Sequence, residues 1–68
     1  MSVRLNILLS DELNTQIEQV AGDRETTKAE VLRKAIALYI AATDGKEKGL
    51  RVGLANSDQK LETEFVGL

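Results

Sequence analysis

The helix expected over residues 27–43 has more apolar surface than so short a chain can cover. At the 100° spacing of helical residues, Ile36 and Ile40 widen its apolar arc to roughly half of the circumference. The main face of this arc carries Val31, Leu32, Ala35, Leu38, Tyr39 and Ala42. One further helix and one strand of the same chain are too small to cover it. The pattern therefore favours association with a second copy of the chain.

The composition points the same way. A chain of 68 residues leaves much of its surface exposed, and domains of this size usually need disulfides, a metal or a partner chain. The sequence contains no Cys and no His, so disulfides and the usual metal sites are excluded. A homodimer is the remaining way to stabilise the fold.

The missing residue types also exclude most enzyme classes. Without Cys or His there is no thiol nucleophile and no imidazole base, and the five glycines are too scattered for a phosphate-binding loop. The eleven carboxylates are expected to be solvated. We therefore expect no catalytic residues, no metal and no cofactor, and a protein that is not an enzyme.

The location of the protein is suggested by two missing signals. The first residues lack the continuous apolar stretch of a signal peptide. No apolar run approaches the length of a membrane span. We expect a cytoplasmic protein that does not bind membranes.

Residues 3–9 alternate between two kinds of side chain, as half-buried strands do. One side carries Val3, Leu5, Ile7 and Leu9, and the other carries Arg4, Asn6 and Leu8. A lone strand leaves its backbone groups unpaired, so this one requires a partner strand. The same strand of a second copy is the simplest partner.

Two helices are expected after this strand. Ser10 is suited to cap the first, which carries a narrow apolar stripe at Leu13, Ile17 and Val20 and is expected to end at Gly22. Residues 27–30 (Thr-Lys-Ala-Glu) have the pattern of a capping box, in which the Glu side chain reaches back to the Thr N–H. The second helix is expected to run to about residue 43 and to stop before Gly45.

The remaining residues predict a linker and a hairpin. Residues 44–49 are polar and rich in glycine, and residues 50–54 and 61–65 alternate on either side of a turn at 56–60. The expected organisation is a binding and dimerisation domain at 1–43, a linker at 44–49 and a C-terminal extension, a β-hairpin, at 50–68.

The order of strand, helix, tight turn and capped helix resembles the ribbon-helix-helix (Arc/MetJ/CopG-like) family of DNA-binding repressors. The resemblance covers residues 3 to about 43. It is carried by residues 4–10 (Arg-Leu-Asn-Ile-Leu-Leu-Ser), the stripe of the first helix, Gly22, and residues 27–32 with Ala35 and Ile36. It implies a mainly α fold with an N-terminal strand, and an intertwined homodimer with an intermolecular two-stranded antiparallel ribbon.

The resemblance also implies functional sites. The family's ribbon enters the major groove of double-stranded DNA, which assigns base reading to Arg4, Asn6 and Leu8. Leu8 departs from the family's usual polar residue there, but it is able to contact a thymine methyl group. The start of the second helix, at Thr26, Thr27 and Lys28, would hold a DNA phosphate. The dimer core would consist of Leu5, Ile7, Leu9, Leu32, Ala35, Ile36 and Tyr39.

Simpler interpretations stand beside these. The residues at 4, 6 and 8 are also what the wet side of a structural strand would carry, and Arg33 and Lys34 are more typical of a solvated helix face than of DNA contacts. The net charge of −2 predicts weak non-specific DNA binding.

Three functions remain open. The first is a transcriptional regulator, a repressor in particular, that binds DNA as a homodimer or as a higher oligomer. The second is an antitoxin that regulates its own operon and binds a toxin protein through residues 44–68. The third is a dimerisation module without DNA affinity. The strand-like alternation after residue 49 favours the regulator.

Overall fold

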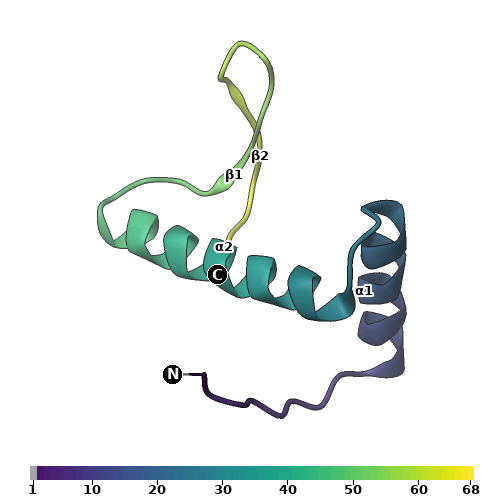
Figure 1. Ribbon diagram of the computed structural model, residues 1–68. Helices are drawn as coiled ribbons and strands as arrows, with labels where there is room; N and C mark the ends of the chain where they lie inside the picture. Colours follow the sequence, from purple (N-terminus) through teal and green to yellow (C-terminus); the bar gives the residue numbers. More distant parts are fainter. Residues whose placement is uncertain (1) are drawn as a thin grey trace. The chain divides into compact units, whose positions relative to one another are not determined.

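The computed structural model describes residues 2–68 and contains two helices followed by a two-stranded sheet (Figure 1). The elements are α1 (Asp11–Asp23), α2 (Lys28–Glu47), β1 (Gly53–Ala55) and β2 (Leu61–Glu64). The chain divides into two units, one that ends at Arg33 and one that runs from Lys34 to Leu68. Each is described by itself.

The N-terminal strand is absent from the described residues, so the expected ribbon-helix-helix fold class is wrong. The order found is helix, helix and C-terminal sheet, and residues 2–10 carry no regular structure. No backbone hydrogen bond joins residues 3–9 to another described residue. Alternation of side chains favours an extended backbone, but a strand exists only where a second strand pairs with it. The intermolecular ribbon was expected to form from this strand, so that expectation is withdrawn as well.

Helix α1 begins as expected and ends later than expected. The Ser10 side chain accepts a hydrogen bond from the N–H of Leu13 at 3.1 Å, which caps the first turn. Gly22 lies inside the helix rather than ending it. The helix ends in a Schellman motif, with Glu25 in the left-handed region at a φ of 53° and the N–H of Thr26 bonded to the carbonyl of Ala21.

A polar contact links α1 to the start of α2. The Lys28 ammonium donates to the Asn14 side-chain oxygen at 2.7 Å and lies 3.6 Å from the Glu18 carboxylate. Asn14 also donates to Glu18 at 2.7 Å, so the three side chains form one small network. All three are at least partly exposed, and such pairs contribute little stability individually. The network places the Lys28 ammonium next to α1 within this unit.

Helix α2 shows half of the expected capping box. The Thr27 hydroxyl accepts from the N–H of Glu30 at 3.1 Å, whereas the Glu30 carboxylate accepts from Arg33 at 2.8 Å instead of reaching back to Thr27. The helix also continues past Thr43 to Glu47.

The longer α2 ends in a second Schellman motif. Gly49 has a φ of 82°, and the N–H of Leu50 bonds to the carbonyl of Gly45 at 2.9 Å. An ion pair between Lys48 and Asp44, at 2.9 Å and a spacing of four residues, supports the last turn. Much of the expected linker at 44–49 is therefore helical.

The C-terminal hairpin is present with shorter arms than expected. Strands β1 and β2 pair antiparallel, with Gly53 opposite Glu64 and a bulge after Leu54. Asn56 organises the turn, because its side-chain oxygen accepts the backbone N–H groups of Asp58 and Lys60, each at 3.0 Å. At Gly53 a Cβ atom would collide with the carbonyl oxygen of Thr63 in β2, so the close approach of the two strands requires glycine there.

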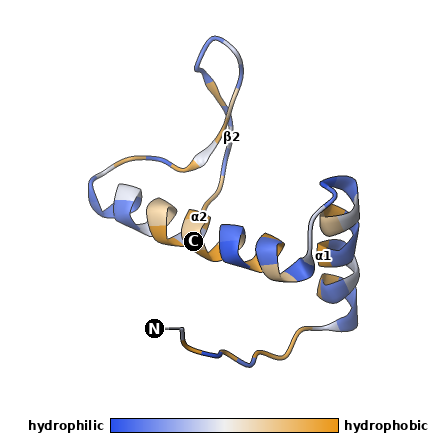
Figure 2. Ribbon diagram, in the orientation of Figure 1, coloured by the Kyte–Doolittle hydropathy of each residue, from blue (hydrophilic) through white to orange (hydrophobic). Residues whose placement is uncertain are grey.

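The described chain has almost no core. Only two apolar residues are buried, Ala21 in the first unit and Ala42 in the second. Large apolar side chains remain exposed on α2, on the hairpin and along the N-terminal segment, where hydrophobic and hydrophilic residues alternate (Figure 2).

Candidate nucleic-acid interface

The segment of residues 2–8 is exposed over its whole length. Arg4 and Asn6 make no hydrogen bond or ion pair with any residue in the range 2–68. Leu8 is fully exposed as well. The side chains of the three residues predicted to read bases are therefore accessible to another molecule.

The start of α2 is the predicted phosphate site. Its three residues make different contacts in the structure. Thr27 caps the helix, and Thr26 is half-buried in the turn before it. Lys28 points its ammonium at Asn14 and Glu18, two residues that the sequence patterns did not single out. The N–H groups of Lys28 and Ala29 belong to the first turn, where a helix has no internal acceptor for them. An anion at this end would meet these amides rather than a free lysine.

The two predicted DNA-contacting groups are not joined to one another. Both lie in the first unit, but no hydrogen bond or ion pair among the described residues connects segment 2–8 to the start of α2. Their cooperation on one DNA site remains a prediction.

The residues predicted for the dimer core are at most partly covered. Leu9 and Leu32 are half-buried, and the others are exposed: Leu5, Ile7, Ala35, Ile36 and Tyr39. Two of them, Ala35 and Tyr39, line an apolar pocket in the second unit.

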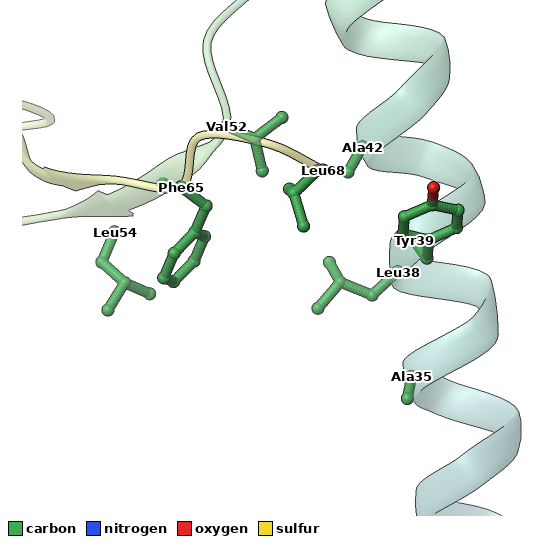
Figure 3. A pocket seen from close by; sticks show the side chains of 9 residues that line it. Ala35, Leu38, Tyr39, Ala42, Val52, Leu54, Phe65 and Leu68 are labelled. Carbon is green, nitrogen blue, oxygen red and sulfur yellow. The ribbon is translucent and has the colours of Figure 1, made fainter.

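This pocket lies between α2 and the hairpin and was missed by the sequence patterns (Figure 3). Its volume is about 420 Å³. The side chains of Leu38, Phe65 and Leu68 point into it, and Tyr39 stands beside Ala42. We call the lining residues the α2–hairpin groove: Ala35, Leu38, Tyr39, Ala42, Val52, Gly53, Leu54, Phe65 and Leu68. The alternation at 50–54 and 61–65 was the available signal, since it gives the hairpin an apolar face.

The described residues show neither a metal-binding cluster nor a membrane-spanning helix. No group of three or more Asp and Glu side chains between residues 2 and 68 is placed to hold a metal ion. Neither of the helices in this part of the chain has the length and apolarity needed to cross a membrane. What the arrangement provides is exposed hydrogen-bonding groups on segment 2–8, two amides at a helix start, and an apolar groove.

Comparison with known proteins adds no relative: no protein-family model, no curated protein and no solved structure matches this chain.

Proposed function

We propose that this protein is a sequence-specific DNA-binding transcriptional regulator, a repressor that acts as a homodimer in the cytoplasm. One observation carries the proposal: Arg4, Asn6 and Leu8 stand exposed on an extended segment, and the two polar ones have no partner among the described residues. Exposed groups of this kind are what base reading requires.

The chemistry of the three side chains matches base edges in the major groove. An arginine donates two hydrogen bonds to O6 and N7 of guanine, and an asparagine pairs with N6 and N7 of adenine. Leu8 supplies the apolar surface that a thymine methyl group meets.

Phosphate binding is assigned to the start of α2, with a changed role for Lys28. The free N–H groups of the first turn and the helix dipole favour an anion there. The Lys28 ammonium is already bonded to Asn14 and paired with Glu18, so its contribution is to hold the helix start against α1. The backbone amides make the phosphate contact, assisted by the Thr27 hydroxyl.

The net charge of −2 agrees with a selective binder rather than a general one. Non-specific affinity comes from cations that neutralise phosphates, and this chain has 9 Lys and Arg against 11 Asp and Glu. Discrimination must then come from base contacts.

The alternative of an antitoxin is separated from the regulator by the C-terminal residues. A segment that folds on a toxin would lack structure of its own before binding. Here β1 and β2 pair with each other and Asn56 closes their turn, which favours the regulator. Purification of the protein in complex with a small toxin would favour the antitoxin instead.

The test is a gel shift on the DNA upstream of the protein's own gene, with wild type, Asn6→Ala and Gln19→Ala. Asn6→Ala should lose about 1–3 kcal/mol of binding free energy and tolerate changes at one base position, because a bidentate contact is removed. Gln19→Ala is the control, since Gln19 is an exposed polar residue of α1. Binding of Asn6→Ala as tight and as selective as that of wild type would refute the reading role of this segment.

A further inference from the structure

We draw no further inference here: the strongest candidate, the apolar groove between α2 and the C-terminal hairpin, carries none, because nothing in the structure shows what covers it.

Discussion

Glu25 occupies a backbone conformation that favours glycine, and it does so at the junction between α1 and α2. Its φ of 53° places it in the left-handed region, where an L side chain costs about 1–2 kcal/mol. The Schellman bonds around it direct the chain from the end of α1 to the cap of α2. The position of the proposed phosphate-binding amides therefore depends on a residue under mild strain.

Glu25→Gly should stabilise the protein by about 0.5–1 kcal/mol, because relief of this strain exceeds the added freedom of glycine in the unfolded chain. Urea unfolding at a fixed protein concentration measures the change. Glu12→Gly in the first turn of α1 is the control and should destabilise, since Glu12 is helical and favourable at that end. A lower urea midpoint for Glu25→Gly than for wild type would contradict this interpretation.

Two glycines of the fold differ in whether a side chain would fit in their place. Gly22 lies inside α1, and no atom comes within 4 Å of the position that a Cβ would occupy, so a side chain has room there. Gly53 in β1 faces the backbone of β2, where the Cα of Glu64 would lie 2.9 Å from an added Cβ. The same substitution should act in opposite directions at the two sites.

Gly22→Ala should therefore raise the free energy of unfolding by about 0.5–1 kcal/mol, since alanine is the better helix former. Gly53→Ala should lower it by about 1–3 kcal/mol, because rigid backbone atoms must move apart. Thermal unfolding followed by circular dichroism gives both signs, and amide hydrogen exchange locates the loss at Gly53→Ala in residues 53–64. Equal effects at the two positions would show that the strands do not approach as closely as described.

The sequence predicted local elements well and non-local ones poorly. The two helices, both of their N-caps and the turn at 56–60 follow from propensities and hydrogen bonds between near neighbours, and all are present. The strand at 3–9 was wrong because its existence depends on a partner that no local pattern supplies. The helix end at Gly22 was wrong because glycine is tolerated inside a helix, where the hydrogen bonds, not the residue type, set the end.

Some features of the candidate sites were predictable from the sequence, and others were not. The alternation of residues 3–9 predicted that Arg4 and Asn6 are exposed. The capping pattern at 27–30 predicted the helix start at Thr27. The engagement of Lys28 by Asn14 and Glu18 was not predictable, because it depends on how α1 and the start of α2 meet within the first unit. The α2–hairpin groove joins residues 35 and 68, and such a separation lies beyond any periodicity in the chain.

Two properties of the chain bear on the proposed regulator. The first is a small core, since only Ala21 and Ala42 are buried among the described apolar residues, and the proposed homodimer would cover part of the apolar surface that remains. The second is its net charge of −2, which predicts weak binding to DNA in general, so the proposed function requires base contacts by Arg4, Asn6 and Leu8.

The ratio of specific to non-specific DNA affinity tests whether this protein reads DNA sequence. Fluorescence anisotropy would compare the DNA upstream of the gene with a scrambled duplex of equal composition, at low and at physiological salt. We expect binding to the upstream DNA to be tighter by a factor of about 10³ or more, with weak binding to the scrambled duplex. Equal affinity for the two duplexes, or no binding to either at low salt, would contradict the proposal that this protein reads DNA.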